Sequence, residues 1–416
     1  MQRILMSLLI ISGILLSTHA RADDSEVTLK ELEQEALQNN PEIRMAGKKA
    51  ESADEKRSLA AAMPDPMIGY MVQNVGSPFT WSVGTEDMSM QGIVFAQEVP
   101  FPGKLSTMGQ AAGKMAEREH ENAREMQLRV LTEVRNAYYE YYLAYQSTEI
   151  ITRTKDLMKN VQQIAETRYG TGQGTQQDVL RAQLEVMMLL DKIAEEERKI
   201  ETQAAMINRL VGRDPLAHLG RPAELPPVSL NKSVEDLAAM AQAHSPLLQG
   251  KQRMVEQSEF EVSSQKKEYL PDMVLSGGWF TRGEKSDVWQ ASVMLKVPLY
   301  FWNKSTGVKA ANADLHAARY DYNTAQLAVL ARMRDLYAMA KTSEHHLHLY
   351  ETGIIPQATQ ALQSTLSNYR VGKTDFLTLL DSQGLLLKYQ LMAQEELANL
   401  HKTLSMIGEM TGEDAK

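Results

Sequence analysis

A motif that occurs twice in the sequence, 200 residues apart, limits the folds open to this chain more than any other feature. The first copy contains Tyr169, Gly172, Leu180 and Gln183, and each of these finds its own residue type 200 positions later. In both copies a helix-forming pattern enters a glycine-containing turn and another helix-forming pattern leaves it. Glycine lets the chain adopt a positive φ and reverse its direction at little steric cost. We therefore predict two long helical hairpins with the duplicated motif at their tips.

The duplication extends beyond the tips, as expected of an internal repeat. Thr28–Glu31 has the pattern of a helix-capping box, and Ser233–Asp236 is its counterpart. Each box opens a short amphipathic helix that is interrupted before a proline, at Asn40-Pro41 and at Ser245-Pro246. The sequence thus predicts a single unit over residues 23–416, with a first repeat at about 28–212, a linker at 213–232 and a second repeat at about 233–412.

Strand patterns follow the proline that ends the second helix of each half. Asp287–Val297 alternates between apolar and polar residues, the period-two pattern of a strand with one apolar face. Its predicted partner is Met273–Thr281, joined to it through residues 282–286. The first half offers Met67–Gln73 and Met90–Val99 in the same order. We therefore predict two β-hairpins, one in each repeat.

Long helical patterns begin directly after the second strand of each half. Lys104–Arg168 contains no proline and would span roughly 97 Å at about 1.5 Å per residue. In the second half, Pro356 is expected to kink the outgoing helix. The return helix of the first hairpin has a 4-3-4-3 spacing that predicts a coiled-coil seam. The residues of this predicted seam are Leu180, Leu184, Met187, Asp191 and Ala194.

The N-terminal segment has the composition of a secretory signal peptide. Arg3 precedes an apolar run, and the small-residue pattern Ala20-Arg21-Ala22 follows it. We expect a signal peptide over residues 1–22, whose removal leaves 42 of the 44 basic residues against 53 acidic ones, a charge of −11 (42 − 53). This acidic balance argues against nucleic acid as a partner. The sequence contains no cysteine, which rules out disulfides and a lipid-linked N-terminal cysteine.

The strand patterns allow two interpretations, a strand pair capping a soluble helical bundle or strands that span a membrane. No stretch after residue 22 has the roughly 18 uninterrupted apolar residues of a membrane-spanning helix. Strand edges cannot stay unpaired in lipid, and four strands cannot close around a lumen. The membrane interpretation therefore requires several copies, and three would supply twelve strands and a helical tube. Aromatic residues would then lie at the membrane interface, namely Phe101, Tyr300, Phe301 and Trp302.

The order of these elements resembles that of the TolC-type outer-membrane factors over nearly the whole chain after residue 22. The resemblance rests on the Tyr-x-x-Gly tips followed by Leu and Gln, the proline at each strand-to-helix junction, and the junction sequence Glu98–Lys104. That junction and the methionine content are most similar to the heavy-metal efflux members of the CzcC and CusC types. The resemblance implies a mainly α fold with a small membrane β part. Its two structural repeats would form a trimeric α-barrel from long helical hairpins, and four strands per chain would contribute to a 12-stranded transmembrane β-barrel.

The resemblance also implies a function that needs neither enzymatic chemistry nor a cofactor. Such a protein is the exit duct of a tripartite efflux system, placed in the outer membrane of a Gram-negative-type cell and extending into the periplasm. It conducts its substrates passively, here heavy-metal cations, while an inner-membrane transporter of the resistance-nodulation-division type supplies the energy. A periplasmic adaptor grips the tips. Two alternatives stay open, an exit duct for type I protein secretion and a soluble periplasmic adaptor with a coiled coil.

The resemblance assigns the periplasmic gate to three residues. Asp178 matches a carboxylate that hydrogen-bonds a tyrosine of the second hairpin, here Tyr369, and this bond would help hold the gate shut. Asp381 matches an aspartate at the narrowest point of the lumen, where three copies would form an electronegative ring. The family's neighbouring aspartate and its basic tip residue are Thr378 and Thr374 here, so the ring would be single. The alternatives are an ordinary helix cap at Asp178 and a solvated helix face at Asp381.

The duplicated tips supply the candidates for contact with the adaptor. Thr171, Gly172, Val371 and Gly372 combine exposed backbone with small side chains, which suits the end-on docking of another helical hairpin. The alternative is ordinary turn chemistry, which favours the same residue types. The duplicated spacing favours docking.

Histidine and methionine residues raise the question of metal binding. His345 and His348 share a predicted helical face, and Glu344 forms an i,i+4 pair with His348. A polar belt around the helical tube is the interpretation that we prefer, so no metal site is predicted. The 24 methionines are expected to serve mainly as pliable core residues. The residues interpreted as too scattered to form a copper-binding ladder are Met63, Met67 and Met71.

Overall fold

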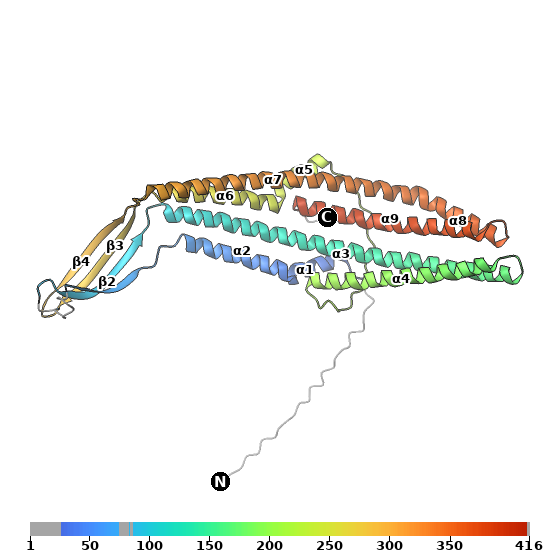
Figure 1. Cartoon of the computed structure of the whole chain (residues 1–416), viewed down its shortest axis with the longest axis horizontal. Coiled ribbons are helices and arrows are strands. Elements are labelled where there is room, and N and C mark those ends of the chain that lie inside the picture. Colours follow the sequence, from blue (N-terminus) through green and yellow to red (C-terminus); the bar gives the residue numbers. More distant parts are fainter. Residues whose placement is uncertain (1–25, 75–82, 84–85, 414–416) are drawn as a thin grey trace, which may run out of the picture.

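The chain is elongated, with a β-sheet at one end and two helical tips at the other (Figure 1). The computed structural model describes residues 26–74, 83 and 86–413, so the predicted signal peptide over residues 1–22 lies outside the described residues. The helices are α1 (Leu29–Asn39), α2 (Pro41–Ala60), α3 (Lys104–Gly170), α4 (Gln176–Val211), α5 (Val234–His244), α6 (Pro246–Lys267), α7 (Phe301–Leu349), η1 (Tyr350–Ile354, a π-helix), α8 (Ile355–Arg370) and α9 (Phe376–Thr411). The strands are β1 (Met67–Gln73), β2 (Met90–Val99), β3 (Asp272–Arg282) and β4 (Lys285–Lys296).

Two long helical hairpins form the tips, as the duplicated motif predicts. The first joins α3, which has 67 residues, to α4, and the second joins α8 to α9. Gly172 and Gly372 have φ values of 71° and 78°, so both turns use the left-handed conformation that glycine adopts without strain. The predicted reversal at the two glycines is therefore confirmed.

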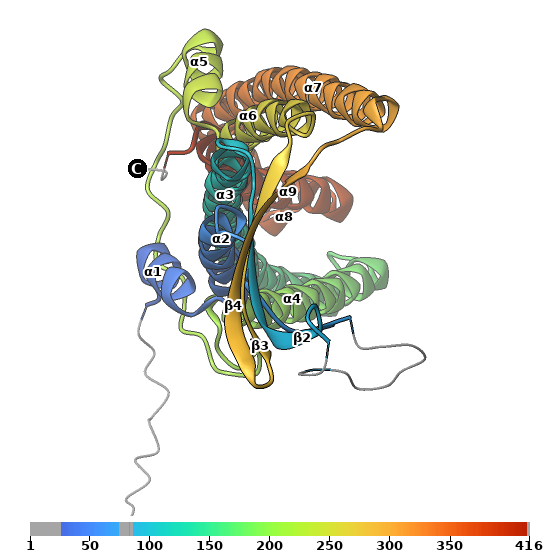
Figure 2. The same ribbon diagram turned by 90° about the vertical axis from the view of Figure 1, so that its left-hand side faces the viewer.

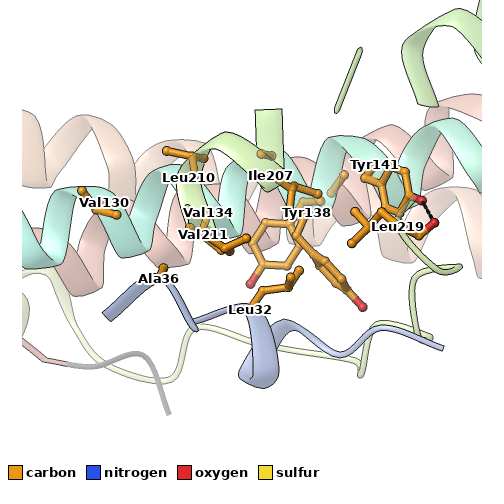
Figure 3. Packing of buried hydrophobic residues seen from close by; sticks show 13 residues of the cluster. Leu32, Ala36, Val130, Val134, Tyr138, Tyr141, Ile207, Leu210, Val211 and Leu219 are labelled. Carbon is orange, nitrogen blue, oxygen red and sulfur yellow. Dashed lines mark hydrogen bonds between the residues drawn. The ribbon is translucent and has the colours of Figure 1, made fainter. Parts of the chain in front are cut away.

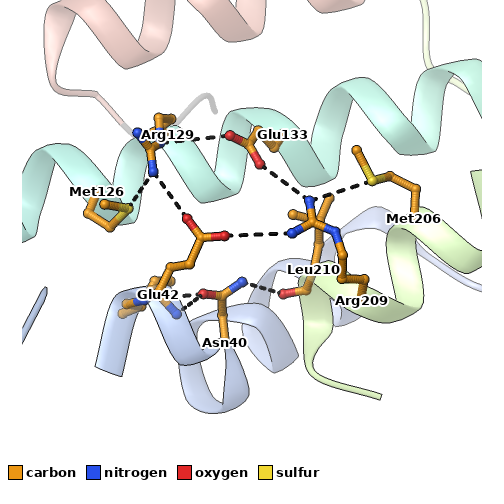
Figure 4. A network of polar contacts seen from close by, with 9 residues as sticks. Asn40, Glu42, Met126, Arg129, Glu133, Met206, Arg209 and Leu210 are labelled. Atoms are coloured by element: carbon orange, nitrogen blue, oxygen red, sulfur yellow. Dashed lines mark hydrogen bonds and ion pairs between the residues drawn. The ribbon is translucent and has the colours of Figure 1, made fainter. Parts of the chain in front are cut away.

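In each half, the second of the two helices before the sheet lies end to end with the long return helix, α2 with α4 and α6 with α9 (Figure 1). Both predicted capping boxes are present, at Thr28 and at Ser233. At the break between α1 and α2, the Asn40 side chain accepts a hydrogen bond from the Glu42 amide at 2.7 Å and donates one to the Leu210 carbonyl at 2.7 Å (Figure 4). One side chain thus satisfies the start of α2 and the last turn of α4.

Glycine makes both of these end-to-end joints possible. Gly212 and Gly412 follow the last residues of α4 and α9 with φ values of 79° and 70°. A Cβ atom at Gly412 would lie 2.5 Å from the His244 carbonyl oxygen, and one at Gly212 would lie 2.9 Å from the Asn39 carbonyl oxygen. Any other residue would push the return helix away from the short helices.

Ion pairs surround the first joint and set the register of α2, α3 and α4 (Figure 4). Glu42 accepts from Arg129 at 3.1 Å and lies 3.6 Å from Arg209, while Glu133 lies 3.7 Å and 3.9 Å from the same two arginines. All four side chains are about half exposed, so the network contributes little stability per pair.

A tyrosine-rich core lies beneath α1 and the linker (Figure 3). The Tyr138 hydroxyl donates to the Val27 carbonyl at 3.0 Å, and the Tyr141 hydroxyl donates to the Gly220 carbonyl at 3.0 Å. Burial raises the pKa of Tyr138 to about 12 and also raises the pKa of Tyr141. Both hydroxyls therefore stay neutral donors. Tyr141 fastens the linker to α3, and Tyr138 fastens the segment before α1 to the same helix.

The four strands form one antiparallel sheet in the order β1-β2-β3-β4. The two predicted hairpins are present, and β2 pairs with β3 to join the repeats. The predicted connection over residues 282–286 is too long, because β3 reaches Arg282 and β4 starts at Lys285. Gly283, with φ 73°, allows the tight two-residue turn that such a hairpin favours.

The long helices line up side by side as an arc, with α1 and α5 on its convex side (Figure 2). The predicted coiled-coil seam is wrong as a contact within the chain, because Leu180, Leu184 and Met187 are more than half exposed. The opposite face of α4 packs inward instead, through Ala182, Val186 and Leu189. The 4-3-4-3 spacing marks an apolar face that has no partner within one chain.

A π-helical turn, Tyr350–Ile354, separates α7 from α8 just before Pro356. The predicted proline kink therefore takes the form of a widened turn. Proline cannot donate the backbone hydrogen bond of a regular helix, and a π-turn is one way for a helix to absorb that loss. Among the described residues, no helix is long and apolar enough to cross a membrane.

Candidate functional site at the helical tips

The two tips lie against each other and border an open cleft of about 520 Å³. Both turns contribute to it, because α3 and α8 end at the same level (Figure 1). The residues around the cleft include Arg168, Asp178, Tyr369, Gly372, Lys373 and Asp375. Two of the three predicted gate residues thus lie at one site, although they are 191 positions apart in the sequence.

Tyr369 and Asp178 are neighbours in the structure, but no hydrogen bond of normal length joins them within this chain. Tyr369 is 1% exposed, its ring lies 5.6 Å from the Phe376 ring, and its buried hydroxyl has no hydrogen-bond partner among the described residues. Burial raises the pKa of Tyr369, and the nearby Asp178 carboxylate raises it further. Asp178 instead accepts a hydrogen bond from the Thr175 hydroxyl at 2.9 Å, as expected of a helix cap.

Arg168 links the two tips, and the sequence reasoning did not single it out. Its guanidinium carbon lies 4.6 Å from the centroid of the Tyr369 ring, a cation–π geometry. The same group donates hydrogen bonds to the Tyr369 carbonyl and, at 3.0 Å, to the Gln173 carbonyl. The only sequence signal was a departure from the repeat, since the second copy has Asn368 at the corresponding position.

The backbone of the second tip is shaped around this arginine. A Cβ atom at Gly372 would lie 3.3 Å from Nη2 of Arg168, tighter than most such contacts. Gly372 therefore serves two purposes, a positive φ and room for the guanidinium group. Thr374 stands where the resemblance places a basic tip residue, and the cations that line this cleft are Arg168 of the first hairpin and Lys373 of the second.

The predicted adaptor-contacting residues lie at the outermost turns. Thr171, Gly172, Val371 and Gly372 are all exposed, and Val371 reaches 68% exposure. The structure thus places an apolar side chain and exposed backbone where another protein could approach end-on.

Asp381 lies apart from the cleft, on the α9 face that carries other exposed residues. Its side chain is solvated in the single chain, as is that of Thr378 one turn earlier. A ring of carboxylates at this level requires further copies of the chain, so the structure of one chain is compatible with both earlier interpretations.

The predicted histidine pair does not gather further ligands. His345 and His348 are exposed on α7, and Glu344 is engaged in fixing the linker through the Leu230 amide. The histidine that forms a contact is His346, whose Nδ1 lies 3.1 Å from Glu396. Among the described residues, no group of three or more His, Asp or Glu side chains is arranged to hold a metal ion.

Comparison with known proteins identifies a family whose model matches both halves of this chain. The family model described as "Outer membrane efflux protein" matches residues 32–213 and 237–409, so its two segments fall on the two halves of the chain. A curated relative, the alkaline protease secretion protein AprF of Pseudomonas aeruginosa, is 23% identical over 381 residues. The alignment covers 84% of this chain and 76% of AprF.

Solved structures share the fold at low sequence identity. The outer membrane protein VceC of Vibrio cholerae superposes with a TM-score of 0.80 at 19% identity, over 93% of this chain and 97% of VceC. CusC superposes with a TM-score of 0.79 at 14% identity, over 93% of this chain and 92% of CusC. Identities this low establish a shared fold and leave the transported substrate open.

Proposed function

Since this chain belongs to the outer membrane efflux protein family, we propose that it is the outer-membrane exit duct of a tripartite efflux system. In this proposal it conducts heavy-metal cations passively out of the cell. An inner-membrane transporter of the resistance-nodulation-division type supplies the energy, and a periplasmic adaptor connects the two. No catalytic residue or cofactor enters the proposal.

The observation that carries the proposal is the two-faced sheet at the end of the helical arc. One face exposes large apolar side chains, with Trp289 at 80% and Ile68 at 76% exposure. Water disfavours such a face, whereas lipid accommodates it. Within the described chain, β1 and β4 each lack a neighbour on one side. Unpaired edges are costly in lipid, which supports a ring of three chains with twelve strands.

The helical part supports the same assembly. The exposed apolar face of α4 includes Leu180, Leu184 and Met187, each between 54% and 59% exposed. In a tube of three arcs, the edge helices would meet those of neighbouring chains and cover these residues (Figure 2). The proposal therefore includes a homotrimer whose strands lie in the outer membrane and whose helices extend into the periplasm.

The tips are the proposed gate and docking site. We expect the Tyr369 hydroxyl and Asp178 to complete their hydrogen bond in the closed trimer, with Asp381 of three chains narrowing the lumen. Thr171, Gly172, Val371 and Gly372 would contact the adaptor. A buried hydroxyl without a partner is uncommon in folded proteins, which favours a bond that forms on closure.

Removal of the Tyr369 hydroxyl tests the latch. We expect Tyr369→Phe to raise the mean single-channel conductance, because a charge-assisted hydrogen bond of about 1.5–3 kcal/mol would be lost at each of three tips. Tyr350→Phe, at a buried tyrosine far from the tips, is the matched control. If the conductance of Tyr369→Phe equals that of the unmodified protein, the hydrogen bond has no role in closure, and Asp178 serves as a helix cap only.

A second function from the same fold is the exit duct of a type I protein secretion system. The relative AprF, described as an alkaline protease secretion protein, favours it. The soluble-adaptor alternative has less support, because the family match covers both repeats and an adaptor would have one hairpin.

Conductance and cell tolerance together test the proposed function. Purified protein inserted into a planar lipid bilayer should give single-channel currents, and its mass in detergent should be that of three chains. Deletion of the gene should lower tolerance to heavy-metal ions in a panel of metals and drugs. A monomer that stays soluble without detergent and carries no current would refute the duct. Normal metal tolerance with loss of a secreted protein would favour the type I system.

A further inference from the structure

The two halves of the chain repeat a pair of charged residues at the border between the sheet and the long helices. Pro64-Asp65 before β1 returns as Pro271-Asp272 before β3. Lys104, the first residue of α3, returns as Lys304 near the start of α7. Both lysines stand 65 positions before the tyrosine of their tip, although the junction before Lys304 is two residues longer. Each half thus carries one acidic and one basic residue at the same end of its hairpin.

Within one chain, the acidic residue of the second half pairs with the basic residue of the first. The Lys104 Nζ lies 2.9 Å from the Asp272 carboxylate, which also accepts a hydrogen bond from the Phe101 amide at 2.8 Å. The side chains of Lys104 and Asp272 are only 7% and 16% exposed. Charge-assisted hydrogen bonds of this kind are shorter and stronger than neutral ones. The pair therefore joins the two repeats beside the place where β2 pairs with β3.

The corresponding pair of Asp65 and Lys304 does not form within one chain, because its members lie at opposite edges of the sheet. Asp65 precedes β1, Lys304 follows β4, and these are the two outer strands. The Asp65 side chain is exposed and has no ion pair or hydrogen bond with any residue that the structure describes. Lys304 lies 3.0 Å from Glu268, which also lies 3.7 Å from Lys104. The repeat thus leaves one carboxylate unpaired at the β1 edge.

The start of α7 lacks a partner of the same kind. Its first turn contains no acidic residue, and no side chain of the described chain caps it. Backbone N–H groups at a helix start carry a partial positive charge, which favours a nearby carboxylate. The start of α3 also has no side-chain cap, but there the Asp272 carboxylate lies beside it. A carboxylate next to Lys304 would give α7 the environment that α3 already has.

The strands carry the same repeat relation. A Val-Pro pair follows the same course at the end of β2 and of β4, with an offset of 198 positions, and the Pro-Asp pairs before β1 and β3 differ by 207. Within the chain, Gln97 on β2 pairs with Leu275 on β3. Transferred to β4 and to β1 of another copy, this register places Leu295 opposite Ile68. Both side chains lie on one face of the sheet, and a slip by one residue would separate them.

We propose that Asp65 of one chain completes an ion-pair site at the start of α7 of the next chain, where it contacts Lys304. The occupant is a second copy of this chain, because the site repeats a contact that the two halves of one chain already make. Lys304 would then lie between Glu268 of its own chain and Asp65 of the neighbouring copy. The inference rests on the proposed ring of three chains and assigns the residues that join its members where the sheet meets the helices.

Charge reversal tests the ion pair in the assembled protein. We expect Asp65→Lys to raise the rate at which purified trimer dissociates in detergent at least about tenfold, because Lys304 would face a like charge. The chain itself should fold, since Asp65 has no partner within it, and circular dichroism checks this. Asp65→Lys combined with Lys304→Glu restores opposite charges and should bring the rate back toward that of the unmodified protein. Glu235→Lys, at an exposed carboxylate on α5 on the convex side, is the control (Figure 2).

Cysteine cross-linking tests the strand register separately, since the chain contains no cysteine. Residues directly opposite each other in antiparallel strands have Cβ atoms about 4.5–5.5 Å apart, which a disulfide can span after a small movement. Ile68→Cys with Leu295→Cys should therefore join chains covalently on oxidation, seen in non-reducing denaturing gels. Val72→Cys with Leu295→Cys, four residues further along β1 on the same face, should leave single chains.

The outcomes separate this inference from the proposed function. If the unmodified protein has the mass of one chain in detergent, the ring of three chains is wrong. If the trimer is stable and Asp65→Lys dissociates no faster than Glu235→Lys, or Lys304→Glu does not rescue it, the ion-pair site is wrong and the ring stands. Assembled trimer without the cross-link between positions 68 and 295 would overturn the register.

Discussion

At the scale of single residues, Arg168 shows how one side chain can hold two distant parts of a chain together. Its planar guanidinium group lies over the Tyr369 ring and donates to two backbone carbonyls, one in each tip. Lysine could supply the charge but not the flat surface or the spread of donors. We infer that Arg168 holds the two tips of one chain in a fixed arrangement relative to each other.

Substitution of Arg168 should loosen the tips. We expect Arg168→Ala to raise the open fraction of single channels about tenfold, because a cation–π contact and two hydrogen bonds, together worth about 1–3 kcal/mol, are lost. The open fraction of Arg168→Lys should lie between that of the unmodified protein and that of Arg168→Ala. Arg153→Ala, at an exposed α3 arginine whose nearest carboxylate is 4.0 Å away, is the control. Equal open fractions for Arg168→Ala and the control would exclude a role for Arg168 in closure.

At the scale of secondary-structure elements, the end of α9 brings acidic groups against α3. Burial raises the pKa of Glu409 above its ordinary value of 4.5, and the charge of Glu125 raises it further, while the nearby Thr132 hydroxyl opposes the shift. Burial also raises the pKa of Glu125. At pH values just above 4.5, these carboxyls therefore stay protonated in the folded chain and lose their protons in the unfolded chain.

The raised pKa of Glu409 determines the direction in which the stability of the fold changes with pH. A carboxyl with a raised folded pKa stabilises the fold fully below pH 4.5, and its contribution is lost as the pH rises through the folded pKa. We expect Glu409→Gln to reduce the fall in melting temperature between pH 4.5 and pH 7 by about 2–4 °C, measured by circular dichroism. Glu195→Gln, at an exposed α4 carboxylate, should reproduce the unmodified profile. A Glu409→Gln profile that matches the unmodified one would refute this account.

Element boundaries could be predicted because single residues determine them. The prolines after the second helices, the tip glycines and the capping boxes act locally, and β1 and β2 occupy the predicted residues. Contacts between distant residues could not be predicted. Arg168 reaches Tyr369 across 201 positions, and no local pattern encodes the pairing of β2 with β3.

At the scale of the whole molecule, one chain is an open arc (Figure 2). Large apolar side chains of α4 stay exposed in this single chain. Helical periodicity predicts an apolar face but does not say whether the same chain or another copy covers it. On α4 both situations occur at once, since Leu189 is fully buried and Met187, two residues earlier, is 59% exposed. The predicted seam is therefore an apolar face that the single chain leaves uncovered.

Charge placed on this face should separate assembly from folding. Leu184→Glu with Met187→Glu would put two carboxylates where a neighbouring chain is expected, and burying an unpaired charge costs several kcal/mol per site. Each chain should still fold, since both side chains are exposed within it. We expect unchanged helical circular dichroism and a mass in detergent that falls from three chains to one. Lys192→Glu, on the same helix but outside the predicted seam, should stay trimeric. A trimer that persists in the double variant would mean that α4 faces the lumen or solvent, and that other helices join the arcs.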